Sequence, residues 1–238
     1  MNTVKYHYYR FSSIDSTQNF VAAQVDFSLP VICRAENQSA GYGQRGAAWF
    51  SPKGGLYFSV GIEINQRQEL LAGITQHIAI TLAEILNNSA KNNNEEIKIK
   101  WPNDLFYRGK KCAGILLQSG KADNAEKSKI ILGVGVNFFA EDGNFIGLRD
   151  KFFSADELFE HLIPELFLLF NYWEKTPYLP LDNSWDKFDL FRNQEIKLEG
   201  DGKIYRNLGI DQKGRICLKK DDKVEFLTSV RISKECLN

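Results

Sequence analysis

The sequence predicts an α+β fold, in which a mixed β-sheet with packed helices is followed by a small β-barrel. Three observations lead to this prediction. Candidate strands and two long amphipathic helices alternate irregularly up to about residue 180, and only short strands with tight turns follow. With 238 residues, 43% of them hydrophobic, the chain is long enough to bury a sizeable core. We therefore expect two domains, residues 1–180 and residues 181–238.

Helices of the first domain are predicted to start at N-cap residues, whose side chains accept hydrogen bonds from free backbone N–H groups of the first turn. Asp15 or Ser16 precedes a short helix, and Ser154 precedes a helix over 154–173. Apolar residues at helical spacing predict one long helix over 68–88. Runs of β-branched and apolar residues predict strands over 30–35, 56–64, 97–101, 104–107, 112–118 and 129–137.

The second domain is predicted from four short alternating segments, at 195–198, 203–210, 215–219 and 224–227. Turn residues separate them at 200–202 and 211–214. In the first domain, Arg108, Gly109 and Lys110 likewise predict a hairpin turn. Short strands joined by tight turns are typical of a small closed sheet.

Composition excludes several classes of function. Lys plus Arg and Asp plus Glu both number 30, so the chain lacks the basic excess of proteins that grip nucleic-acid backbones. Four scattered cysteines without a CxxC pair, and three scattered histidines, form no zinc motif and indicate reduced thiols. The N-terminus has no apolar segment typical of a secretion signal, and the run 158–173 is too polar to span a membrane. We expect a cytoplasmic protein with neither DNA nor a membrane as partner.

A glycine-rich segment, Gly41–Gly46, satisfies the pattern G-x-G-x-x-G of dinucleotide-binding proteins. That motif requires a helix to begin at its last glycine, so that the helix N-terminus meets the pyrophosphate. Here Pro52, Gly54 and Gly55 follow closely and exclude a helix. An anion-binding loop and a purely structural loop remain equally open from these residues alone.

Three further segments carry polar or glycine residues next to predicted strands. Lys100 to Asp104 (KWPND) surrounds a proline bend, which favours either a polar site or a surface turn. Lys111 begins a strand that is otherwise buried, so its ammonium points either into a cleft or out at a strand end. Gly133 and Gly135 lie within a strand that ends at Asn137, which indicates a close approach to the backbone or simple packing.

Taken in series, these segments resemble the motifs of the biotin–protein ligases in order and spacing. The matching segments are Ser16-Thr17-Gln18, Ala35–Gln38, Gly41–Pro52 with Trp49, Lys100–Asp104, Lys111–Leu116 and Gly133–Asn137. The resemblance implies a class II synthetase-like catalytic fold followed by an SH3-like domain. It also implies the short, monofunctional type of the family, without an N-terminal DNA-binding domain.

The resemblance further implies roles for individual residues. Those similar to the family's biotin-binding positions are Ser16, Thr17, Gln18, Gln38, Gly41, Tyr42, Gly43, Gln44, Lys111 and Gly114. Those similar to its positions for ATP and the adenylate are Arg45, Gly46, Trp49, Lys100, Asn103 and Asn137. Lys111, Arg45 and Lys100 are the implied catalytic cations, and Asp104 is the implied ligand of Mg²⁺.

The implied activity is the formation of biotinyl-5′-AMP from biotin and ATP, with release of pyrophosphate. Biotin would then pass to a lysine of a biotin carboxyl carrier protein, a part of acetyl-CoA carboxylase or of another biotin-dependent carboxylase. Dimerisation is a further expectation from the resemblance. Two alternatives stay open: a lipoate or octanoate transferase of the same fold, and a catalytically weak biotin-binding sensor.

The glycine loop departs from the family pattern at two positions. Where members often have G-R-G-R-R-G, this chain has Tyr42 and Gln44 in place of two arginines, so Arg45 is the only cation in the loop. Neither Tyr nor Gln can replace the bidentate phosphate contact of a guanidinium. We expect weaker retention of the adenylate than in a loop rich in arginine.

Overall fold

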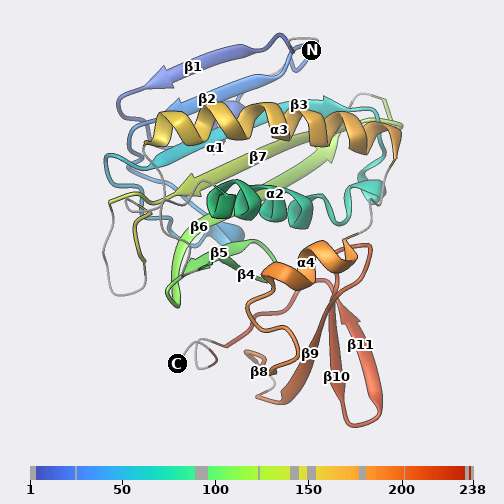
Figure 1. Ribbon diagram of the computed structural model, residues 1–238. Helices are drawn as coiled ribbons and strands as arrows, with labels where there is room; N and C mark the ends of the chain where they lie inside the picture. The colour runs from blue at the N-terminus through green and yellow to red at the C-terminus, as the bar shows by residue number, and fades with distance from the viewer. Residues whose placement is uncertain are drawn as a thin grey trace.

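The computed structural model describes residues 4–24, 26–88, 96–122, 124–139, 145–148, 154–176, 181–200, 202–233 and 236. Within these residues the chain forms a large mixed sheet with helices on both faces, and a smaller antiparallel sheet at one end of it (Figure 1). The predicted fold class is confirmed.

The large sheet has seven strands in the order β1-β2-β3-β7-β6-β5-β4. The pair β1–β2 is parallel and every other pair is antiparallel, so the sheet is mixed. Its strands are β1 (His7–Phe11), β2 (Val31–Ala35), β3 (Leu56–Ile64), β4 (Lys98–Lys100), β5 (Asp104–Tyr107), β6 (Lys110–Lys121) and β7 (Ser128–Val136). Strand β1 was not predicted, because its residues are mostly exposed and show no regular alternation.

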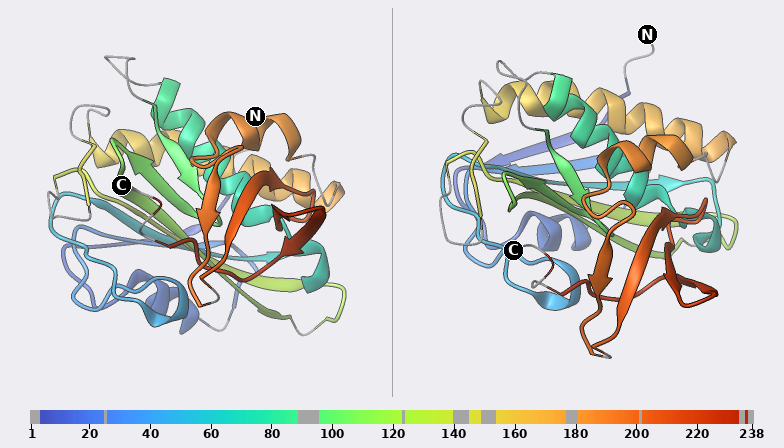
Figure 2. Two further views of the ribbon diagram at one scale, coloured as in Figure 1. Left: turned by 90° about the horizontal axis from the view of Figure 1, so that it is seen from below. Right: turned by 60° about the horizontal axis from the view of Figure 1, so that its bottom comes forward.

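The two faces of this sheet differ in the helices that cover them and in the polarity of their side chains. Helices α2 (Ile74–Asn88) and α3 (Ala155–Lys175) cover one face, and α1 (Thr17–Ala22) lies on the other (Figure 2). Strand β3 separates the faces by alternation, since Phe58 and Val60 belong to the apolar core that α2 and α3 share. The intervening residues of β3 include Ser59, which lies on the α1 side and bonds to side chains of α1. The face covered by α1 therefore carries hydrogen-bonded polar side chains, whereas the opposite face is apolar.

The predicted helix starts are confirmed. The side chain of Ser16 accepts a hydrogen bond from the backbone N–H of Asn19 at 3.3 Å. The side chain of Ser154 accepts one from the backbone N–H of Glu157 at 3.1 Å. Both caps satisfy N–H groups that a helix cannot pair internally.

The helix predicted over 68–88 is interrupted near its start. A short 3₁₀ segment, η2 (Gln68–Leu71), precedes α2, and Gly73 between them has a φ of 95°, outside the right-handed helical region. The stretch Gln68–Asn88 is long and apolar enough to cross a membrane by length and composition. Its apolar face packs on the sheet and on α3, however, as expected of a core helix.

The C-terminal part consists of helix α4 (Asp182–Phe188), which was not predicted, and four strands. The strands β8 (Glu195–Lys197), β9 (Ile204–Ile210), β10 (Ile216–Lys220) and β11 (Lys223–Leu227) form an antiparallel sheet in the order β11-β10-β9-β8. The backbone of 231–233 returns to pair with 197–199, through Glu199 N to Arg231 O at 2.8 Å and Ser233 N to Lys197 O at 2.8 Å. This arrangement fits an SH3-like domain.

The two sheets share one continuous apolar core. Ile196, Tyr205 and Leu218 of the small sheet belong to the same buried cluster as α2 and α3. The indole N–H of Trp101 donates to the backbone carbonyl of Gly214 at 2.9 Å across the junction. The division into domains at residue 180 therefore stays a prediction, and residues 177–180 lie outside the described residues.

Candidate active site

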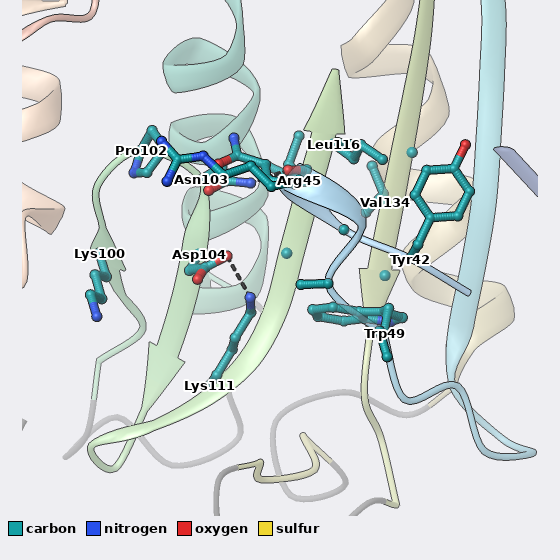
Figure 3. Close-up of a pocket in the computed structure, with 18 of the residues that line it drawn as sticks. Tyr42, Arg45, Trp49, Lys100, Pro102, Asn103, Asp104, Lys111, Leu116 and Val134 are labelled. Carbon is teal, nitrogen blue, oxygen red and sulfur yellow. Dashed lines mark hydrogen bonds and ion pairs between the residues drawn. The ribbon is translucent and has the colours of Figure 1, made fainter. Parts of the chain in front are cut away.

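A cleft of about 980 Å³ opens on the α1 face of the large sheet, beneath the glycine loop (Figure 3). Most of the residues implied by the family resemblance line it, although they come from five separate segments. Those that line the cleft are Ser16, Thr17, Gln18, Gln38, Tyr42, Gly43, Gln44, Arg45, Trp49, Lys100, Asn103, Asp104, Lys111 and Gly114. Gly41, Gly46 and Asn137 do not line it.

The glycine loop folds as a tight hairpin and no helix follows it, as the sequence predicts. Backbone hydrogen bonds of 2.8 Å join Gly43 N to Ala47 O and Trp49 N to Gly41 O. The tip is the 3₁₀ turn η1 (Gln44–Gly46), in which Arg45 has a φ of 57°. A Cβ at Gly41 would come within 2.8 Å of Ser51 Oγ, so this glycine lets the base of the loop close. The dinucleotide-binding interpretation is excluded.

Paired glycines of two neighbouring strands form a flat floor in the middle of the cleft. Gly114 of β6 lies opposite Gly135 of β7, and the indole of Trp49 rests on both. A Cβ at Gly135 would lie only 2.5 Å from Trp49 Nε1, and one at Gly114 only 2.9 Å from Trp49 Cζ3. The prediction of a close approach to Gly133 and Gly135 is confirmed: the Trp49 ring approaches Gly135, and the Gln18 side chain approaches Gly133.

The inner end of the cleft is polar and uncharged. Gln38 Oε1 accepts hydrogen bonds from the backbone N–H of Thr17 at 2.8 Å and from its hydroxyl at 3.1 Å. Ser59, which the sequence did not single out, has its hydroxyl 3.0 Å from that of Thr17 and 2.9 Å from Gln18 Oε1. Gly133, next to Ser59 in the sheet, leaves the space that the Gln18 amide occupies. This end suits a compact polar group.

The opposite end of the cleft is cationic. Lys111 Nζ lies 2.6 Å from Asp104 Oδ1 (dashed in Figure 3) and 4.9 Å from the centre of the Trp49 ring. The prediction that the Lys111 ammonium points into a cleft is confirmed. Lys100 donates to the backbone carbonyl of Ile232 at 3.1 Å. Burial lowers the pKa of Lys100, and the nearby Asp104 opposes that shift.

Other charged residues at this end were not singled out as site residues. The cleft is lined by six basic side chains, of Arg45, Lys100, Arg108, Lys110, Lys111 and Arg231, and by two acidic ones, of Asp104 and Glu199. The hairpin turn after β5, with a φ of 51° at Arg108 and 72° at Gly109, brings two of the six to the cleft. Such an excess of positive charge favours an anionic ligand.

The C-terminal segment supplies one wall of the cleft. Val230, Arg231 and Ile232 line it, and Arg45 Nη2 at the tip of the glycine loop donates to Ser229 Oγ at 2.8 Å. No local signal in the sequence could have placed these residues beside the glycine loop, because the contact joins positions 184 residues apart.

Two buried N–H donors near the glycine floor have no hydrogen-bond partner within the described residues. They are Trp49 Nε1 and Asn137 Nδ2. Asn137 accepts a hydrogen bond from the Tyr57 hydroxyl through its Oδ1 at 3.3 Å, and burial raises the pKa of that tyrosine. A buried donor without an acceptor is costly, and Trp49 lines the cleft, so a ligand there could supply an acceptor to its Nε1; Asn137 does not line the cleft.

Asn103, which also lines the cleft, donates through its Nδ2 to the backbone carbonyl of Ile115. Among the described residues, no three His, Cys, Asp or Glu side chains come together in a way that could hold a metal ion. The four cysteines are free, in agreement with the expected reduced thiols.

The fold and the cleft define a class of protein, an α+β protein with a cleft that is polar and uncharged at one end and cationic at the other. A family model described as "Biotin/lipoate A/B protein ligase family" matches residues 11–137. The chain belongs to this family.

Individual relatives agree with this assignment. The chain is 33% identical over 222 residues to the bifunctional ligase/repressor BirA of Escherichia coli (strain K12), covering 87% of this chain and 68% of that protein. It is 32% identical over 222 residues to the same protein of Salmonella typhimurium, with equal coverage.

Among solved structures, the biotin protein ligase from Aquifex aeolicus in complex with biotin and ATP is similar to this chain. The TM-score is 0.76 at 21% sequence identity, over 95% of this chain and 97% of that one. A biotin acetyl coenzyme A carboxylase synthetase from Helicobacter pylori gives a TM-score of 0.68 at 21% identity, over 93% and 100%. At these identities the likeness supports the fold.

Proposed function

We propose that the protein is a biotin–protein ligase, an ATP-dependent enzyme that makes biotinyl-5′-AMP and pyrophosphate and then biotinylates a lysine of a biotin carboxyl carrier protein. Family membership supports this function, and so does similarity to ligases that act on biotin. One observation carries the proposal for this chain: a single cleft has a polar inner end and a cationic outer end, with an aromatic ring between them.

The cationic end would promote the first step. A biotin carboxylate that attacks the α-phosphate of ATP brings two anions together, and pyrophosphate departs with further negative charge. Lys111, Arg45 and Lys100 line the cleft where that charge would develop, and fixed cations lower the barrier by meeting it. No covalent enzyme nucleophile is needed for this chemistry.

Lys111 has a defined starting position for its role. Its ammonium is held between the Asp104 carboxylate at 2.6 Å and the face of Trp49 at 4.9 Å. Two contacts on one flexible side chain reduce the freedom that it would lose on binding a phosphate. Asp104 is thus a positioning residue for Lys111 in the free protein.

The region around Trp49 suits the adenylate. The ring offers an aromatic face, and the N–H groups of Trp49 and Asn137 lack partners within the described residues. A purine ring stacks on aromatic faces and carries nitrogen acceptors for such donors. These assignments, and that of Asn103, are proposals for the site.

Mg²⁺ would enter with the ATP phosphates. Magnesium is usually held by one or two carboxylates together with substrate phosphates and water, so the carboxylate of Asp104 fits this mode. The ion would neutralise charge on the β- and γ-phosphates. Chelation with EDTA should abolish pyrophosphate release and leave biotin affinity unchanged; full activity in EDTA would remove the metal from the proposal.

The test of the function is incubation with ATP, biotin and a biotin carboxyl carrier domain. The expected result is a mass increase on the carrier equal to one biotinyl group, with one pyrophosphate released per transfer. Transfer of a lipoyl or octanoyl group instead would establish the alternative transferase. Tight biotin binding without pyrophosphate release would establish the sensor.

Two finer statements belong to the same proposal. We propose that the carrier is a subunit of acetyl-CoA carboxylase or of another biotin-dependent carboxylase, and that the enzyme works in the cytoplasm as a homodimer. A sedimentation measurement with and without biotin and ATP tests the oligomeric state.

A further inference from the structure

The cationic end of the cleft repels the charged form of the second substrate. The acceptor lysine of a carrier protein is an ammonium at neutral pH, and six basic side chains line the cleft. A cationic lysine therefore needs a carboxylate on its route to the activated acid. Among the described residues, the acidic side chains that line the cleft are those of Asp104 and Glu199. These two are the candidates for that contact.

The carboxylate of Asp104 already has a strong partner. Its Oδ1 lies 2.6 Å from Lys111 Nζ, which is the distance of a charge-assisted hydrogen bond. The same carboxylate is the proposed ligand of Mg²⁺ in the first step. A further cation at Asp104 would compete with both partners, so Asp104 is poorly suited to receive the carrier lysine.

The carboxylate of Glu199 is held loosely. It lies 3.8 Å from Arg231 Nη1, whereas a charge-assisted hydrogen bond measures about 2.7–2.9 Å. The Glu199 side chain is 42% exposed, so another protein can reach it. Glu199 can therefore accept a second cation without giving up a short hydrogen bond.

The backbone holds Glu199 beside the catalytic cations. Its N–H donates to the carbonyl of Arg231 at 2.8 Å, and the preceding residue, Leu198, forms a bridge with Ile232. The carbonyl of Ile232 in turn accepts a hydrogen bond from Lys100 Nζ at 3.1 Å. Burial lowers the pKa of Lys100, and the charge of Glu199 is among those that oppose this shift. Glu199 thus stands at the end of the cleft where the acid is activated.

We infer that Glu199 receives the ammonium of the carrier's acceptor lysine and guides it to biotinyl-5′-AMP. This inference rests on the proposed function. In the transfer step the lysine nitrogen bonds to the biotinyl carbonyl carbon, the bond from that carbon to the AMP oxygen breaks, and the nitrogen gives two protons to water. Glu199 acts before this step, because it binds the charged form of the lysine. A neutral nucleophile should not need it.

The first experiment measures carrier biotinylation by the parent protein and by Glu199→Gln, which removes the charge and keeps the shape. The kcat/KM for a biotin carboxyl carrier domain should fall about fivefold at low ionic strength, as for the loss of one well-formed, partly exposed ion pair. The difference should shrink at high salt, because ions screen an exposed charge. Glu199→Lys reverses the charge and should lower kcat/KM further than Glu199→Gln.

The second experiment replaces the carrier by hydroxylamine. This nucleophile is uncharged at neutral pH and attacks the same anhydride, which gives biotinyl hydroxamate and AMP. The rates of hydroxamate formation and of pyrophosphate release should be the same in the parent and in Glu199→Gln. A difference confined to the charged nucleophile assigns Glu199 to recognition of the lysine.

Glu225→Gln is the matched control. Glu225 is an exposed glutamate of β11 in the same small sheet, and it lies outside the cleft. The variant has the same net charge as Glu199→Gln and should keep the parent's kcat/KM for the carrier. An equal loss in both variants would show a long-range effect of net charge and would overturn the inference.

The remaining outcomes separate the inference from the function on which it rests. A parent protein that neither biotinylates the carrier nor forms the hydroxamate overturns the proposed function. If the parent does both, and Glu199→Gln and Glu199→Lys keep its kcat/KM for the carrier, the inference is wrong. An equal loss with carrier and hydroxylamine also contradicts it, since Glu199 would then act on the first step, through Lys100 or as a second carboxylate on Mg²⁺.

Discussion

Replacing Gly135 by alanine tests whether the glycine floor positions Trp49 for the nucleotide. The added Cβ would lie 2.5 Å from Trp49 Nε1 and 2.6 Å from Cε2, whereas favourable contacts between such atoms are about 3.5–4.0 Å. The indole must therefore lift by about 1 Å. Overpacking of this kind costs about 1–3 kcal/mol of stability, and a displacement of about 1 Å at a catalytic site can reduce the rate about a hundredfold.

The assay for Gly135→Ala follows pyrophosphate release as a function of ATP concentration, with biotin affinity measured separately. We expect the KM for ATP to rise or kcat/KM to fall by about tenfold to a hundredfold, because the displaced ring no longer fits the base. Biotin affinity should hardly change, since the polar end of the cleft lies around Thr17 and Ser59.

Gly120→Ala is the control for Gly135→Ala. Gly120 belongs to β6, and a Cβ there would have no atom within 4 Å. It should leave ATP kinetics unchanged. An unchanged KM and kcat/KM for ATP in Gly135→Ala, with the protein folded, would refute the proposed function of the floor.

Three further predictions concern single residues. Gln44→Arg should slow the escape of biotinyl-AMP into solution, because a guanidinium forms a bidentate phosphate contact that Gln44 cannot; release that is no slower, followed by rapid filtration, would contradict this. Lys111→Ala should reduce pyrophosphate release by about 10²–10³-fold while thermal unfolding shows a folded protein, and full activity would disprove its role. Asp189 is buried and accepts hydrogen bonds from Phe191 N at 3.0 Å and Asn207 at 2.9 Å, yet burial raises its pKa above the usual 3.8. Its protonation therefore contributes stability that is present below pH 3.8 and is lost as the pH rises through the raised pKa. The free energy of unfolding of the parent, relative to that of Asp189→Asn, should decline over that pH range in denaturant titrations at several pH values. A difference that does not change with pH would contradict this prediction.

Several elements could be predicted from local chemistry alone. The caps at Ser16 and Ser154 depend on one side chain and the next turn of backbone, so sequence suffices to find them. Strand β3 was predicted with its observed bounds, Leu56–Ile64, because a run of mostly apolar residues begins after two glycines and ends before the polar Asn65. The hairpin turn at Arg108 and Gly109 is likewise local, because it depends on the ability of these two residues to adopt left-handed backbone conformations.

Other elements depend on partners that are distant in sequence. Strand β1 is exposed and exists because it pairs with β2, and the break at Gly73 lies where the backbone of residue 212 comes within 3.2 Å of a Cβ position. Ser59 has an ordinary place in an apolar strand, and only the positions of Thr17 and Gln18 make its hydroxyl part of a polar row. No pattern around residue 59 could have predicted that.

The sequence by itself determined the fold class and the series of motifs, because these depend on residue types at short spacing. The resemblance of those motifs to a family implied 14 of the residues that line the cleft. The tertiary structure alone decided how they meet. It placed the indole of Trp49 on Gly114 and Gly135, joined Lys111 to Asp104, and made Val230–Ile232 a wall of the cleft. Such contacts are set by sheet register and by packing across the whole chain, and neither is encoded in any local segment.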